Sequence, residues 1–80
     1  MKIAEDVVAV LRSLEWRGRV GIVTVPFNAP LFERVYAALE DLGGTWSPRH
    51  GGHAFDSEEE RRSAVKAINA GRYRRQEVPA

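Results

Sequence analysis

The stretch that decides the fold runs from Leu42 to Phe55 and reads LGGTWSPRHGGHAF. It holds four of the seven glycines, one of the two tryptophans and both histidines of the 80-residue chain. Glycine at this density excludes a long helix, and Pro48 marks a turn. The stretch therefore predicts a helix that Gly43 ends, followed by two short strands over residues 45–47 and 53–55, joined by a loop over residues 48–52.

The residues before this stretch predict one helix and one strand. Apolar side chains at helical spacing predict a helix over residues 3–15, and Gly18 is the expected stop. Residues 20–27 are rich in valine and end beside Pro26, so they predict a strand. Because this strand is apolar on both faces, we expect it to be a central one.

Two further helices have recognisable start and stop residues. Asn28 is a suitable N-cap, and Pro30 is tolerated in the first turn of a helix that continues to residue 42. Ser57 followed by Glu60 forms a capping box that begins the last helix, which Gly71 ends. We detect no internal repeat in the sequence.

These elements predict a single small α+β domain in the order α-β-α-β-β-α, with a three-stranded, mainly antiparallel sheet packed with helices. We assign residues 1–71 to the domain and residues 72–80 to a polar tail that contains arginines. A chain this short has room for one core and little room for a deep catalytic cavity. We expect Trp46 and Phe55 to be largely buried as core aromatics of the hairpin.

Composition excludes several classes of protein. The chain has no cysteine, so it holds no disulfide framework, thiol nucleophile or thiolate metal site. Twelve basic and eleven acidic residues give a net charge of +1, unlike the strongly basic balance of a DNA-coating protein. The first residues are not those of a signal peptide, and no apolar run approaches the ~18 residues of a membrane span. We therefore expect a cytoplasmic protein that does not bind membranes.

The sequence offers weak candidates for metal binding and catalysis. His50 and His53 are three residues apart, but Gly51 and Gly52 lie between them, so no helix fixes their geometry, and zinc requires three or four ligands. Ser47 near His50 is a candidate dyad that lacks an evident third member. We therefore expect no enzymatic activity, no metal and no cofactor.

Charged and aromatic residues are the candidates for binding a partner. Carboxylates at the end of the second helix oppose the helix dipole, and capping explains only some of those at the start of the third. Trp16 lies beside arginines and is a candidate interface anchor. The predicted partner-binding residues are Glu40, Asp41, Asp56, Glu58, Glu59 and Trp16. The alternative is contact with nucleic-acid phosphates, for which the candidates are Arg49, Arg72, Arg74 and Arg75. For the three tail arginines, a solvated and frayed terminus is the competing interpretation.

Residues 31–55 (LFERVYAALEDLGGTWSPRHGGHAF) resemble a short module of phage and plasmid proteins, found in the N-terminal parts of some mobile-element DNA methyltransferase-like proteins. The module is a helix ending in leucine-glycine-glycine, then a small residue, tryptophan, a basic turn and histidine-x-phenylalanine. The matching positions here are Leu42, Gly43, Gly44, Trp46, Arg49, His53 and Phe55. The resemblance covers about a third of the chain and implies no methyl transfer.

The resemblance implies a phage or prophage accessory protein, a group that includes anti-restriction and anti-CRISPR inhibitors. Our leading hypothesis is a non-enzymatic inhibitor that binds a bacterial CRISPR surveillance complex of the Cascade type and blocks its access to target DNA. The alternative is a small nucleic-acid-binding or regulatory module that uses the arginine tail. A third interpretation is a structural subunit that forms a homodimer.

Overall fold

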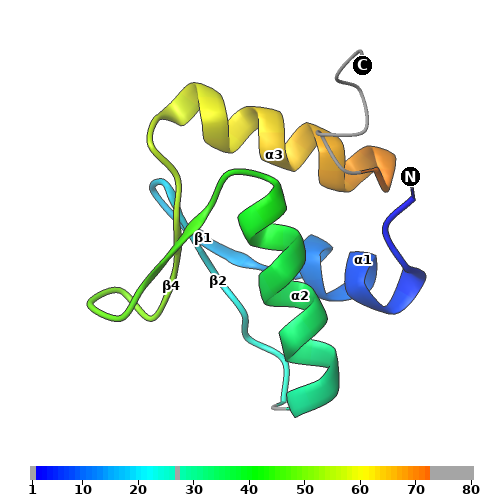
Figure 1. The fold of residues 1–80 in the computed structure, drawn as a ribbon. Coiled ribbons are helices and arrows are strands. Elements are labelled where there is room, and N and C mark those ends of the chain that lie inside the picture. Colours follow the sequence, from blue (N-terminus) through cyan, green and yellow to red (C-terminus); the bar gives the residue numbers. More distant parts are fainter. Residues whose placement is uncertain (1, 27, 73–80) are drawn as a thin grey trace.

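The structure is a computed structural model that describes residues 2–26 and 28–72. Within these residues the chain forms three helices and a four-stranded sheet (Figure 1). The elements in chain order are α1 (Glu5–Arg12), β1 (Glu15–Arg17), β2 (Val20–Ile22), α2 (Ala29–Asp41), β3 (Thr45–Ser47), β4 (Gly52–Ala54) and α3 (Glu58–Ala70). The α+β class is confirmed, whereas the predicted count of three strands and the predicted order are wrong.

The strand that the sequence analysis missed is β1, which lies where the first helix was expected to end. Because Arg17 pairs with Val20, only Gly18 and Arg19 connect β1 to β2. Gly18 has a φ of 59°, the left-handed conformation that a two-residue hairpin turn requires. The glycine that was expected to stop a helix therefore forms the turn of a β-hairpin.

All strand pairs of the sheet are antiparallel, and the strand order is β1-β2-β4-β3. The central position predicted for the valine-rich strand is confirmed, because β2 lies between β1 and β4. The β1–β2 and β3–β4 hairpins meet through the pairing of Val20 with Ala54 and of Gly21 with His53. This order leaves β1 and β3 as the two edge strands.

Each hairpin is followed by a helix of 13 residues, so the chain contains two successive ββα units that the sequence did not reveal. Both helices begin in the same way. The Asn28 side chain accepts a hydrogen bond from the Leu31 backbone N–H at 3.2 Å, and the Ser57 hydroxyl accepts one from the Glu60 backbone N–H at 3.1 Å. The two predicted N-caps are therefore confirmed.

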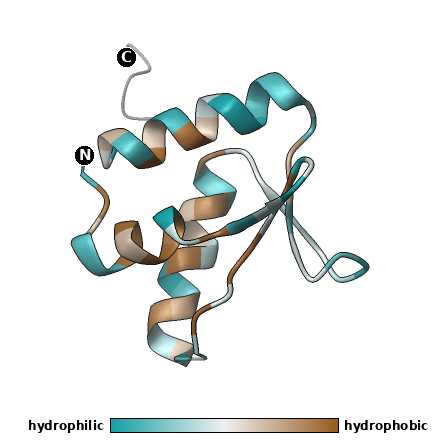
Figure 2. Cartoon of the chain, turned by 180° about the vertical axis from the view of Figure 1, so that it is seen from behind, coloured by the Kyte–Doolittle hydropathy of each residue, from teal (hydrophilic) through white to brown (hydrophobic). Residues whose placement is uncertain are grey.

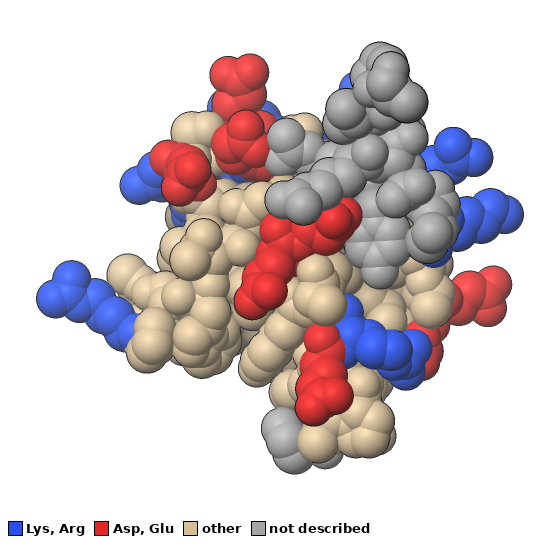
Figure 3. Space-filling model, viewed as in Figure 1, with Lys and Arg blue, Asp and Glu red and all other residues tan. Residues whose placement is uncertain are grey.

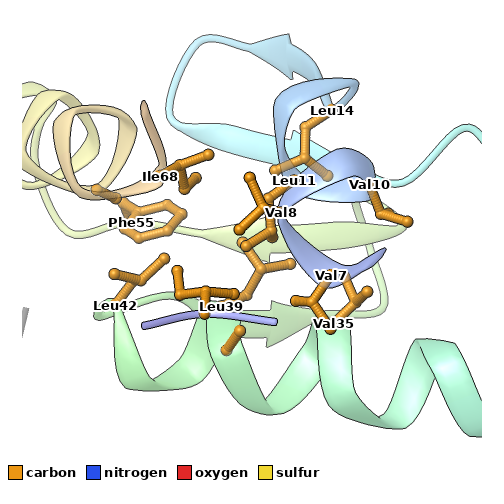
Figure 4. Packing of buried hydrophobic residues seen from close by; sticks show 13 residues of the cluster. Val7, Val8, Val10, Leu11, Leu14, Val35, Leu39, Leu42, Phe55 and Ile68 are labelled. Atoms are coloured by element: carbon orange, nitrogen blue, oxygen red, sulfur yellow. The ribbon is translucent and has the colours of Figure 1, made fainter. Parts of the chain in front are cut away.

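The core lies between the three helices and includes Leu14, directly before β1, and Phe55, directly after β4. Figure 4 shows Phe55, directly after β4, among Leu39 and Leu42 from the α2 end and Ile68 from α3. Phe55 is 3% exposed, so its predicted burial is confirmed. Figure 2 shows that α1 and α2 are largely hydrophobic where they face each other, while α3 is mostly hydrophilic.

The helices gather to one side of the sheet, and the tip of the β3–β4 hairpin projects away from them (Figure 1). The two ends of the domain meet, because the Ile3 N–H donates to the Gly71 carbonyl at 2.8 Å. Among residues 2–26 and 28–72, every helix is too short or too polar to cross a lipid bilayer.

Candidate interaction surface around Trp46

One row of residues crosses the whole sheet and places a tryptophan on each edge strand. The register pairs Trp16 with Gly21, Gly21 with His53, and His53 with Trp46. Because residues directly opposite each other on paired strands point to the same face, these four positions share one side of the sheet. The two tryptophans thus occupy equivalent positions in the two hairpins, with different neighbours.

Trp16 leans over Gly21 and packs on the core. A Cβ atom at Gly21 would lie only 3.1 Å from two carbons of the indole, so the ring fills the space that the glycine leaves. The ring centroids of Trp16 and Phe55 are 5.6 Å apart. The guanidinium carbon of Arg61 lies 5.7 Å from the indole centroid. Trp16 is therefore half-buried, and its role as an interface anchor stays a prediction.

Trp46 lies outward because His53 occupies the position that corresponds to Gly21. The imidazole meets the indole edge-on, with ring centroids 5.4 Å apart and an interplanar angle of 63°. Trp46 is 42% exposed, and it is the exposed large hydrophobic residue of the part of the chain that the structure describes. The predicted burial of Trp46 is wrong, since the neighbouring strand carries a buried ring where the other hairpin carries a glycine.

Tyr36 on α2 packs against the exposed indole of Trp46. The Tyr36 and Trp46 rings are stacked, with centroids 5.4 Å apart and an interplanar angle of 26°. Tyr36 also lies 5.0 Å from the His53 ring. We call Tyr36, Trp46 and His53 the aromatic cluster. Stacked aromatic pairs contribute ~0.5–1.5 kcal/mol beyond the area they bury, so Trp46 is held in a defined position while exposed.

Glu40 adds a negative charge beside the aromatic cluster. Its carboxylate Oε2 lies 4.0 Å from His53 Nε2, beyond hydrogen-bond distance. The His53 side chain is 1% exposed, and its Nε2 has no hydrogen-bond partner in the part of the chain that the structure describes. Burial lowers the pKa of His53, and the charge of Glu40 offsets this only in part.

This arrangement leaves a neutral imidazole at pH 7 beneath a carboxylate whose side chain is 62% exposed. The imidazole of His53 therefore does not neutralise the charge of Glu40. Asp41, the next predicted partner-binding residue, lies half-buried at the end of α2.

The other predicted acidic residues lie at the start of α3, apart from the aromatic cluster. Asp56, Glu58 and Glu59 are exposed. Glu58 accepts a hydrogen bond from Arg61 Nε, and this contact lowers the pKa of the carboxyl group. Figure 3 shows acidic and basic side chains interleaved over this end of the molecule. This group is thus a mixed-charge surface, and its role in partner binding stays a prediction.

The predicted nucleic-acid residues lie in different parts of the fold. Arg49 is exposed in the turn between β3 and β4, and Arg72 is exposed directly after α3. Arg74 and Arg75 lie outside the residues that the structure describes. Contact of these arginines with nucleic acid stays a prediction.

The predicted Ser47–His50 pair is in contact, with Ser47 Oγ 2.9 Å from His50 Nδ1. Both residues belong to the same short hairpin turn region, and no carboxylate of residues 2–26 or 28–72 forms a hydrogen bond with His50. Over those residues, no group of three or more histidine, aspartate or glutamate side chains is placed to hold a metal ion.

Comparisons with protein-family models, curated proteins and solved structures found no match to this chain.

Proposed function

We propose that this protein is a non-enzymatic binding protein that contacts a protein partner through the surface formed by Trp46, Tyr36 and Glu40. The observation that carries the proposal is the 42% exposure of Trp46 while it is stacked on Tyr36. Tryptophan and tyrosine are enriched among the residues that dominate binding energy at interfaces. A ring that is already ordered loses little conformational freedom on binding, which favours affinity.

In its more specific form, the proposal is that the partner is a bacterial CRISPR surveillance complex, whose access to target DNA the bound protein blocks. Two features support it. The resemblance of residues 31–55 to a mobile-element module includes Trp46 and His53, which are two of the three members of the aromatic cluster. The net charge of +1 favours a protein partner over a bare phosphate backbone.

The experiment measures target-DNA binding by purified Cascade-type complexes in the presence of the intact protein. We expect saturable inhibition that Trp46→Ala weakens at least tenfold, whereas Lys66→Ala on the exposed side of α3 leaves it unchanged. Circular dichroism verifies that both variants fold. Complexes that bind DNA normally in excess protein would exclude the CRISPR form of the proposal.

The acidic residues at the start of α3 provide the competing surface on the same protein. Reversing Glu58 and Glu59 to arginine turns any attraction to a basic partner groove into repulsion. If this double variant loses the partner while Trp46→Ala retains it, the contact surface is the start of α3 instead of the aromatic cluster.

A nucleic-acid-binding function is the second candidate, because Arg49 and the exposed Trp46 lie on the same hairpin. Single-stranded nucleic acids bind proteins by stacking bases on aromatic rings beside basic residues. Fluorescence anisotropy with labelled single- and double-stranded oligonucleotides at several salt concentrations tests this function. Salt-dependent binding that Arg49→Ala weakens would support it.

A further inference from the structure

We infer that Trp46 and Glu40 form a binding site for an arginine side chain of the protein partner, with the guanidinium stacked on the indole and hydrogen-bonded to the carboxylate. The inference rests on the proposed function and names the chemistry that the partner must present.

The chain itself contains this arrangement at the equivalent edge of the sheet. There, the Arg61 guanidinium lies over the Trp16 ring at 5.7 Å, and Arg61 Nε donates a hydrogen bond to the Glu58 carboxylate. One arginine thus joins a tryptophan on the edge strand and a glutamate on a helix. The row of paired residues across the sheet makes Trp16 and Trp46 equivalent in position, and Trp46 also has a helix glutamate near it, Glu40 at the end of α2, which contacts the same His53 ring.

The aromatic part of the site has an open surface for a flat cation. Tyr36 stacks on the Trp46 ring, yet Trp46 stays 42% exposed, so part of the indole remains open to a flat cation. Tryptophan is the strongest aromatic partner for cations, and the planar guanidinium of arginine stacks on it better than the ammonium group of lysine does.

The charged part of the site is the Glu40 carboxylate. The neighbouring His53 Nε2, 4.0 Å away, is buried and lacks a hydrogen-bond partner among the described residues, so the imidazole lies beside the carboxylate without neutralising it. Glu40 also lies in the last turn of α2, where a negative charge opposes the helix dipole. A cation bound here would neutralise the carboxylate and would also offset its unfavourable interaction with the helix dipole.

The two parts are close enough for one guanidinium to reach both. Both lie against the same imidazole, with the Trp46 centroid 5.4 Å from the His53 ring centroid and Glu40 Oε2 4.0 Å from His53 Nε2. A guanidinium has five N–H donors in a planar fork, so it can stack and donate at the same time. The carboxylate repels phosphate groups, which favours an arginine of a protein over a nucleic acid.

The test is an NMR titration of the intact protein with three peptides that differ in one side chain: Gly-Arg-Gly, Gly-Lys-Gly and Gly-citrulline-Gly, all with capped termini. Citrulline keeps the shape of arginine and lacks its charge. We expect saturable shifts of the Trp46 indole N–H with the arginine peptide, weaker ones with the lysine peptide, and none with the citrulline peptide.

Two carboxamide variants serve as a matched pair, because Glu40 and Glu33 are both exposed residues of α2. We expect Glu40→Gln to weaken binding of the arginine peptide by about tenfold, and Glu33→Gln to leave its affinity unchanged. Equal effects of the two variants, or equal shifts from the citrulline peptide, would overturn the inference. Tighter binding of an oligothymidine than of the arginine peptide at Trp46 would instead identify a nucleic-acid surface.

The outcome separates this inference from the proposed function. Arginine binding at Trp46 without inhibition of any CRISPR complex would retain the site and remove that partner. Inhibition that Trp46→Ala abolishes and Glu40→Gln leaves intact would retain the proposed function and remove the arginine site.

Discussion

Gly21 and His53 lie directly opposite each other on the two central strands, and they decide how the two tryptophans of the protein are placed. Trp16 lies down over the glycine and joins the core, whereas Trp46 is held outward against the imidazole. The difference between glycine and histidine at equivalent positions of the two hairpins thus leaves one aromatic ring exposed.

We predict that Trp46→Ala and Phe55→Ala differ strongly in their effect on stability. Because Trp46 is 42% exposed, its loss removes mainly the stacking on Tyr36 and should cost about 1 kcal/mol. Phe55 is 3% exposed, so Phe55→Ala should lower the free energy of unfolding by about 3–5 kcal/mol, enough to unfold much of a marginally stable domain. Urea denaturation followed by circular dichroism measures both. Similar losses from the two variants would mean that Trp46 is a core residue.

A side chain at position 21 should move Trp16 out of its place on the sheet. A Cβ atom there lies 3.1 Å from two indole carbons, so Gly21→Ala should cost about 1–3 kcal/mol. In a Trp46→Phe background, Trp16 is the remaining tryptophan, and its fluorescence emission should shift to longer wavelength as the ring becomes exposed. An unchanged emission maximum would show that the indole does not depend on the glycine.

The local features of the fold could be predicted from the sequence, because each depends on a few neighbouring residues. Asn28 and Ser57 cap the helices where expected, and Gly71, with a φ of 71°, ends the last one in the left-handed conformation. The β1–β2 hairpin was missed because Gly18 is equally suited to end a helix and to form a tight turn.

The candidate site could be predicted only in pieces, because its assembly depends on contacts distant in sequence. The sequence predicted Glu40 as a partner-binding residue and offered His53 only as a weak metal-binding candidate, whereas it placed Trp46 in the core. Its exposure follows from the register that sets His53 opposite it, which no local pattern reveals. The spacing of four residues between Tyr36 and Glu40 was the one signal that they share a helix face.

The ion pair between Asp6 on α1 and Arg34 on α2 should be visible as a shifted titration. The Arg34 guanidinium donates two hydrogen bonds to the carboxylate, at 3.1 and 2.6 Å, and so holds the pKa of Asp6 below its ordinary value of 3.8. NMR titration of the Asp6 carboxyl carbon should therefore give a midpoint below that value. Arg34→Gln should raise the midpoint, and Arg12→Gln is the matched control on α1. A titration midpoint of Asp6 that is unchanged in Arg34→Gln would contradict this contact.

His53 should make stability depend on pH in a defined window. Burial of the ring lowers its pKa in the folded protein below the ordinary value of 6.5, with partial compensation by Glu40. As the pH falls below 6.5, the unfolded chain therefore takes up this proton before the folded protein does, so the free energy of unfolding decreases. The stabilisation from this group is complete above 6.5 and is lost progressively as the pH falls toward the pKa of the folded state.

The measurement is urea denaturation between roughly pH 7.5 and pH 5.5, above the range in which ordinary carboxylates titrate. In the part of the chain that the structure describes, Tyr36 and Glu40 are the titratable groups that face His53. His53→Gln should flatten the profile, while His50→Gln, in the exposed turn, should leave its slope unchanged. If His53→Gln does not fold, the NMR titration of His53 in the unaltered protein decides the question. A midpoint at or above 6.5 would show that Glu40 outweighs burial and that the carboxylate is already neutralised by its imidazole.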